Sequence, residues 1–195
     1  MKKNSKNKAF TLIELLTVIA IFAVVTATVM ANYQSFGHRT KLKNLAYNIG
    51  LSIREAQVSG LTGRNVDVSG GDYYATYGIF FNMSTPKRVV FFKDRPNLGT
   101  QYKYDDPSED VPGLSFNILG ANKITGLCIY SAVDANCTPV NQLYVSFKRP
   151  QPDANIYSES GGPYPRASIE LTSVENNQFY IVVEAAGQIS VRATP

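Results

Sequence analysis

The chain has 195 residues, 44% of them apolar, and a formal net charge of +4. This length suits one compact domain on an anchor, and the apolar content allows a substantial core. Four of the 19 basic side chains are lysines within the first nine residues, and the remaining 15 equal the 15 acidic side chains in number. This balance argues against broad electrostatic attraction to nucleic acid, so no nucleic-acid partner is expected.

The segment from Phe10 to Ala31 is apolar and contains one charged side chain, Glu14. As a helix it would extend about 33 Å at roughly 1.5 Å per residue, enough for a hydrocarbon core of about 30 Å. An ionisable group inside such a span costs at least ~2.5–3.5 kcal/mol and usually marks a function that involves a partner. We therefore predict a transmembrane segment over residues 10–31 in which Glu14 serves assembly.

No basic side chain of the same run is present to neutralise Glu14. If the chain were cut between Ala9 and Phe10, the new α-amine of Phe10 would lie four residues before Glu14. In a bundle of identical helices, the amine of one subunit could pair with Glu14 of its neighbour and set the register between them. The alternative is a carboxylate close enough to the membrane interface to reach water or to stay protonated.

The residues around Glu14 resemble the N-terminal signal of the type IV pilin and pseudopilin superfamily. The shared features are a short basic leader over residues 1–9, a Phe after the cut, Thr-Leu-Ile-Glu-Leu-Leu over 11–16, and a following apolar helix. The resemblance implies that a prepilin peptidase cuts between Ala9 and Phe10 and methylates the new amine of Phe10. It implies that Glu14 is used in assembly with other subunits. It also implies a single pass in the inner membrane, a head outside, and entry into an extracytoplasmic filament.

Two positions depart from that family's pattern, because Ala9 stands where Gly is usual before the cut and Ala31 where Pro is frequent. An ordinary secretory signal is the main alternative. Lysines, an apolar core and a small-residue site over 29–31 satisfy it as well, and that cut would leave Asn32 first. The apolar stretch is longer than the usual h-region of about 7–15 residues, and Glu14 has no role in such a signal. The prepilin interpretation is therefore favoured.

The absence of proline from Phe10 to Ser59 predicts one helix over that range. Residues 32–60 form its amphipathic half, with Gly60 near its end, and His38 is expected to be solvated. One face of this half is apolar and should pack on a core. The residues of that face are Leu42, Leu45, Ala46, Ile49, Ile53 and Ala56.

Residues 61–195 form a β-rich head, in which short aromatic and β-branched segments alternate with Gly, Pro, Asn and Asp. Segments 95–113 and 149–166 are expected to be long surface loops. Turns are expected at Asn176-Asn177 and at Gly187. The candidate strands are 74–82, 87–94, 114–119, 127–131, 142–148, 167–174, 179–184 and 188–192. The overall prediction is an α+β fold, with the amphipathic half-helix packed on an antiparallel sheet or a two-sheet head.

Two stretches of the sequence resemble the H-type minor pseudopilins and their relatives in pili. The first is the closing sequence FYIVVEAAGQISVR over 179–192, which resembles the last hairpin of those heads. The second is NLAYNIGLSIREAQVSG over 44–60, which resembles the end of their helix. This resemblance favours the H-type branch over the major pilins.

Cys128 and Cys137 are the only cysteines, and in an extracytoplasmic domain such a pair indicates a local disulfide. Free thiols are the alternative. A zinc site is not expected, since two cysteines and the single distant histidine, His38, fall short of four ligands. Neither a metal nor any other cofactor is therefore expected.

No catalytic constellation is visible, and an enzyme is not predicted. The acidic group Asp105, Asp106, Glu109 and Asp110 lacks the spacing of an EF-hand and is interpreted as a solvated loop, with a calcium-binding loop as the alternative. Two arginines, at 166 and 192, could contact DNA, but strand-edge solubility explains them equally well.

The predicted function is structural: a subunit of a type IV pilus or a type II secretion pseudopilus. Its partners would be prepilin peptidase, the inner membrane and other subunits bound through the helix. The alternatives are a membrane-anchored or conventionally secreted β-rich binding module and a DNA-uptake pilin. A secreted hydrolase has no supporting motif.

Overall fold

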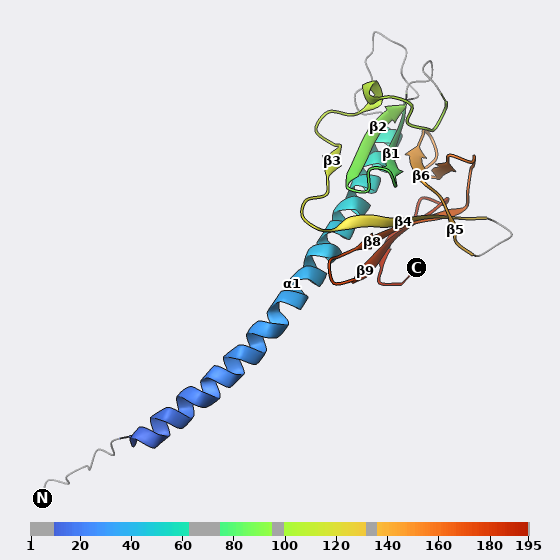
Figure 1. Ribbon diagram of the computed structural model, residues 1–195. Coiled ribbons are helices and arrows are strands. Elements are labelled where there is room, and N and C mark those ends of the chain that lie inside the picture. The colour runs from blue at the N-terminus through green and yellow to red at the C-terminus, as the bar shows by residue number, and fades with distance from the viewer. Residues whose placement is uncertain (1–9, 63–74, 95–99, 132–135, 195) are drawn as a thin grey trace, which may run out of the picture. The chain divides into compact units, whose positions relative to one another are not determined.

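The structure is a computed structural model that describes residues 10–62, 75–94, 100–131 and 136–194, with the side chains of all but residues 31–36. The leader over 1–9, including Ala9, lies outside the described residues. The chain divides into two units, one up to His38 and one from Arg39 onward. Helix α1 (Leu12–Thr62) contributes residues to both units (Figure 1).

Helix α1 begins two residues after the predicted start and continues past Ser59 and Gly60 to Thr62. Gly60 lies near the end of the helix, as expected, and a side-chain contact satisfies a carbonyl of the last turn. The Arg149 Nε donates to the carbonyl oxygen of Leu61 at 2.6 Å, and the Thr62 Oγ1 donates to that of Val58 at 2.8 Å. The Arg149 donor satisfies the carbonyl of Leu61, one of the last carbonyls of the helix, which have no backbone partner within it.

The second unit contains two antiparallel sheets, which confirms the α+β fold (Figure 1). The first sheet has the order β3-β2-β1-β6-β7, and the second has the order β10-β9-β8-β4-β5. The strands are β1 (Thr76–Asn82), β2 (Arg88–Asp94), β3 (Phe116–Asn117), β4 (Lys123–Tyr130), β5 (Thr138–Pro139), β6 (Gln142–Phe147), β7 (Ala154–Ser158), β8 (Arg166–Thr172), β9 (Gln178–Glu184) and β10 (Ile189–Arg192).

One hydrophobic cluster joins the buried face of α1 to both sheets. The residues that the helix contributes to this cluster are those of the predicted apolar face. Leu45 is partly buried, and the other five side chains are fully buried. Ile79 and Val145 are inward residues of the first sheet, and Ile169 and Ile181 are inward residues of the second. The helix therefore takes part in the core of the head, as the 3.6-residue period predicted.

A second cluster covers the other face of the first sheet. Phe80 stacks on Tyr144 with ring centroids 4.8 Å apart and on Tyr104 at 5.0 Å. Phe92 and Val90 complete the buried part of this cluster. The segment that carries Tyr104 is therefore packed on the sheet, although it was predicted to be a surface loop. It also contains a short 3-10 helix, η1 (Pro107–Glu109).

Four strand predictions differ from the structure. Only Phe116–Asn117 (β3) of the predicted strand 114–119 is a strand. Strand β7 lies in the predicted loop 149–166, where the Pro and Gly content obscured a short alternation of buried and exposed residues. Strand β4 begins at Lys123 rather than at the predicted Leu127. Its register shifts between Ile124 and Gly126, and in the sequence Gly126 had been interpreted as a break before the strand. Strand β5 was not predicted.

Both predicted turns near the end of the chain are confirmed. Asn176 has a φ of 58° in the turn between β8 and β9, and Gly187 has a φ of 81° between β9 and β10. Asn and Gly are the residues that adopt this left-handed conformation most readily. The last two hairpins were therefore predictable from local sequence.

Candidate assembly site

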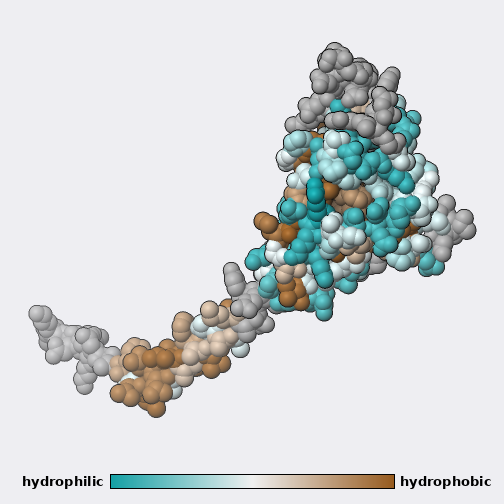
Figure 2. All heavy atoms as spheres, turned by 45° about the horizontal axis from the view of Figure 1, so that its top comes forward, coloured by the Kyte–Doolittle hydropathy of each residue, from teal (hydrophilic) through white to brown (hydrophobic). Residues whose placement is uncertain are grey.

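The N-terminal part of α1 is an exposed apolar segment. Leu12–Met30 has a mean hydropathy of 2.5 and is long and apolar enough to cross a membrane by length and composition. Its large apolar side chains are each more than half exposed within the first unit (Figure 2). Apolar surface of this extent is unfavourable in water, and it fits a segment that lipid or other apolar helices cover.

Thr11 and Glu14 form a reciprocal cap at the start of this segment. The backbone N–H of Thr11 donates to Glu14 Oε2 at 2.9 Å, and the Thr11 hydroxyl donates to the same oxygen at 2.7 Å. In return, the backbone N–H of Glu14 donates to the Thr11 Oγ1 at 3.3 Å. This is the capping-box arrangement of Thr-x-x-Glu, which satisfies two backbone donors of the first turn.

The capping box gives Glu14 a local partner that the sequence analysis did not identify. The partner predicted for Glu14 was an amine of a neighbouring subunit, because no basic side chain lies in the segment. The signal was present, since a Thr three residues before a Glu at the head of an apolar run is the capping-box pattern. Glu14 can therefore serve the helix start and also offer a carboxylate to a second chain.

The residue that follows the predicted cut is accessible. Phe10 is exposed, and both Phe10 and Thr11 precede the first helical residue. Ala9 lies outside the described residues, so the structure describes only the Phe10 side of the Ala9/Phe10 junction.

Cys128 and Cys137 form the predicted disulfide, with their Cα atoms 5.3 Å apart. Cys128 lies in β4, opposite Pro139 of β5. The bond therefore reinforces the pairing of these two strands, and the chain has no free cysteine.

The acidic group was predicted to be a solvated loop, but its carboxylates have structural partners. Glu109 is buried and accepts the backbone N–H of Asp105 at 2.9 Å. Asp106 caps η1 by accepting from Ser108 N at 2.6 Å, and Asp110 forms an ion pair with Arg88 at 2.8 Å. Within the described ranges, no group of three His, Cys, Asp or Glu side chains could hold a metal ion.

The other singled-out residues do not gather into a site. His38 is a partly exposed residue of α1. The Arg166 guanidinium lies 3.9 Å from the centre of the Tyr130 ring, while the Arg192 Nε donates to Ser190. In the strand register, Arg166 lies opposite Glu184 and Arg192 lies opposite Tyr180. These two positions are toward opposite ends of β9. The two arginines therefore do not form a basic patch.

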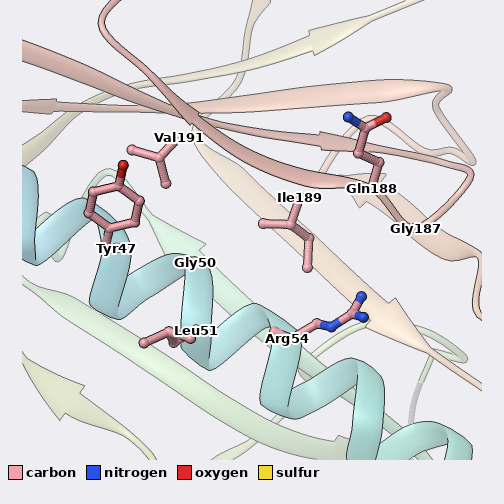
Figure 3. Close-up of a pocket in the computed structure, with 8 residues that line it drawn as sticks. All are labelled: Tyr47, Gly50, Leu51, Arg54, Gly187, Gln188, Ile189 and Val191. Carbon is pink, nitrogen blue, oxygen red and sulfur yellow. The ribbon is translucent and has the colours of Figure 1, made fainter.

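A groove runs between α1 and β10 in the second unit (Figure 3). Tyr47, Leu51 and Arg54 of α1 form one wall, and Ile189 and Val191 of β10 form the other. The groove has a volume of about 450 Å³. The groove was not predicted, although Tyr47 and Leu51, exposed residues four apart on the helix beside its buried face, are a local signal for an apolar surface.

Residues 4–30 match the family model described as the prokaryotic N-terminal methylation motif. The match includes the Ala9/Phe10 junction, Glu14 and the exposed apolar segment, and it supports the type IV pilin and pseudopilin class. The motif indicates a structural precursor rather than an enzyme. No curated protein and no solved structure matches the chain.

Proposed function

We propose that this chain is the precursor of a type IV pilin or pseudopilin subunit. A prepilin peptidase cuts it between Ala9 and Phe10 and methylates the new amine of Phe10. The observation that carries the proposal is the match of residues 4–30 to the N-terminal methylation motif. The exposed, non-helical Phe10 and the apolar helix that follows it support the same assignment.

The mature chain then spans the inner membrane once, with its head on the far side from the leader. Lipid covers the exposed apolar segment before assembly, and the same segments of other subunits cover it in the filament. Packing of apolar helices with Glu14 paired to a neighbour's amine would fix the register between subunits. The filament is a type IV pilus or a type II secretion pseudopilus.

Within this class we favour the H-type minor pseudopilins. The hairpin of β9 and β10 closes the second sheet through the Gly187 turn, and this is the part of the sequence that resembles that branch. A DNA-uptake role has less support, because Arg166 and Arg192 lie at opposite ends of β9.

The test is the intact mass and N-terminal sequence of the protein recovered from its native host. A chain that starts at a methylated Phe10 is the expected result. A start at Asn32 would show a conventional signal peptide, and the binding-module alternative would replace the proposal. Two variants give matched controls: Ala9→Gly should be processed at least as fully as the natural chain, and Ala9→Leu should stay uncut.

A further inference from the structure

The groove between α1 and β10 has apolar walls that the head leaves uncovered. Leu51 is 65% exposed, and Ile189 and Val191 lie across the gap from Gly50, the residue that precedes Leu51 in the helix (Figure 3). Among the described residues no carboxylate pairs with Arg54, whose guanidinium donates to the side-chain oxygen of Gln57. An occupant should therefore bring an apolar side chain together with a hydrogen-bond acceptor.

The size of the groove limits what it can hold alone. A volume of about 450 Å³ accommodates a few side chains, whereas a specific protein interface buries about 800 Å² on each partner. The occupant must therefore be held mainly by another contact, and a second copy joined through its apolar helix meets this condition.

The same chain carries a suitable projecting side chain. Leu119 is 87% exposed and follows β3, the edge strand of the first sheet. It borders a second groove, lined on the helix side by Lys41 and Leu45. Asn117 and Asn122 also line that groove and carry amide oxygens that can accept hydrogen bonds.

Leu119 and the first groove lie on opposite flanks of α1. At 3.6 residues per turn, Lys41 and Leu45 point to one side of the exposed helix face, and Gly50 and Arg54 point to the other. The two flanks are bordered by β3 and β10, the edge strands of different sheets. A copy placed beside the helix can therefore present its Leu119 flank to the groove of the next copy.

We propose that Leu119 of one subunit packs into the groove formed by Leu51, Ile189 and Val191 of the next. Asn117 and Asn122 of the first subunit supply acceptors for Arg54 of the second. A contact between two different surfaces of the same chain can repeat without closing, which builds a filament. The inference rests on the proposed function, because the small contact needs helix packing to raise the local concentration of heads.

Cross-linking of full-length protein in the native host tests this contact. Leu119→Cys and Leu51→Cys chains are expressed together and treated with a short bismaleimide. A cross-linked dimer is expected, and either variant expressed alone should give at least tenfold less. Val174→Cys is the matched control, since Val174 is an apolar residue of the head that is 62% exposed and lines neither groove. With Leu51→Cys it should give no dimer.

A second measurement compares filament recovery after shearing. Leu119→Asp should lower recovery at least fivefold, while Val174→Asp leaves it unchanged. If Leu119→Asp filaments are recovered normally and no Leu119–Leu51 dimer forms, the contact is refuted and the proposed function stands. If the unmodified chain keeps its leader or stays out of filaments, the proposed function fails and the contact fails with it.

Discussion

Gly60 of α1 lies directly against the backbone of Phe147 in β6, so that a Cβ on Gly60 would be 2.5 Å from the Phe147 carbonyl oxygen. Real side chains do not approach a backbone oxygen this closely, and the helix or the strand would have to move. The absence of a side chain at residue 60 therefore sets how closely the end of the helix packs on the first sheet.

Replacing Gly60 should destabilise the head, because a forced shift of well-packed elements costs about 1–3 kcal/mol. We expect Gly60→Ala to lower the free energy of unfolding within that range, measured by urea unfolding of the full chain in detergent. Gly50→Ala is the matched control. Its Cβ would meet Val191 Cγ2 at an ordinary 3.5 Å, so the better helix propensity of alanine should add up to about 1 kcal/mol. Equal effects of the two substitutions would contradict this explanation.

The cap and the charge of Glu14 can be separated by substitution. Gln also serves in a capping box, so Glu14→Gln keeps the cap and removes the charge. Thr11→Val removes the hydroxyl of the cap, at about 0.5–2 kcal/mol, and keeps the charge. If the charge drives assembly, Glu14→Gln should be lost from sheared filaments while remaining in the membrane fraction, and Thr11→Val should assemble. The reverse pattern on immunoblots would mean that Glu14 acts mainly through the helix start.

Gln57 joins α1 to two distant backbone segments. Its side chain is buried, and the Nε2 donates to the carbonyl oxygens of Pro152 at 2.7 Å and of Gly187 at 3.2 Å. Gln57→Glu would place a carboxylate oxygen against these carbonyls and should lower the free energy of unfolding at pH 7 by about 1–3 kcal/mol.

This loss should depend on pH. The carbonyl oxygens of Pro152 and Gly187 disfavour a carboxylate at residue 57 relative to a protonated carboxyl, while the Arg54 guanidinium beside the other oxygen reduces this difference. The deficit relative to the natural chain should therefore shrink as pH falls and the carboxyl gains a proton that it can donate. Urea unfolding at several pH values measures this trend, and a deficit that is constant with pH would refute the assigned hydrogen bonds.

Asp94 is a buried carboxylate, 2% exposed, that holds the segment packed on the first sheet. One of its oxygens accepts the backbone N–H of Tyr102 at 2.7 Å, and its other oxygen has no hydrogen-bond partner among the residues that the structure describes. Burial raises the pKa of Asp94; the Tyr102 N–H opposes this rise, Asp105 adds to it, and Lys148 also opposes it.

The raised pKa gives the stability of the head a definite dependence on pH. The folded state holds the proton more tightly than the unfolded chain, so the stabilising contribution is complete below about pH 4 and declines as pH rises through the folded-state pKa. Asp94→Asn keeps an acceptor for Tyr102 and removes the charge. Its free energy of unfolding relative to the natural chain should therefore increase between about pH 4 and pH 7. A difference that falls over this range would show that the charged form is the favoured one.

Local patterns predicted much of the fold correctly. The buried face of α1, the hairpin turns at Asn176 and Gly187, and the Cys128–Cys137 bond each follow from residues close together in the chain. The capping box of Thr11 and Glu14 was equally local and was overlooked. The missed strand β7 is only five residues long, and an alternation that short, between proline-rich flanks, is difficult to distinguish from a loop.

The sequence by itself determined the signal for processing, the apolar helix with its single carboxylate, and the α+β class, because each depends on the identity and period of neighbouring residues. Only the tertiary structure decided that Gly60 meets Phe147, that Asp94 is buried with one oxygen unpaired among the described residues, and that Ile189 lies close to Gly50 beside a groove. These relationships join residues far apart in the chain. They arise from the packing of a helix against two sheets, which no local pattern encodes.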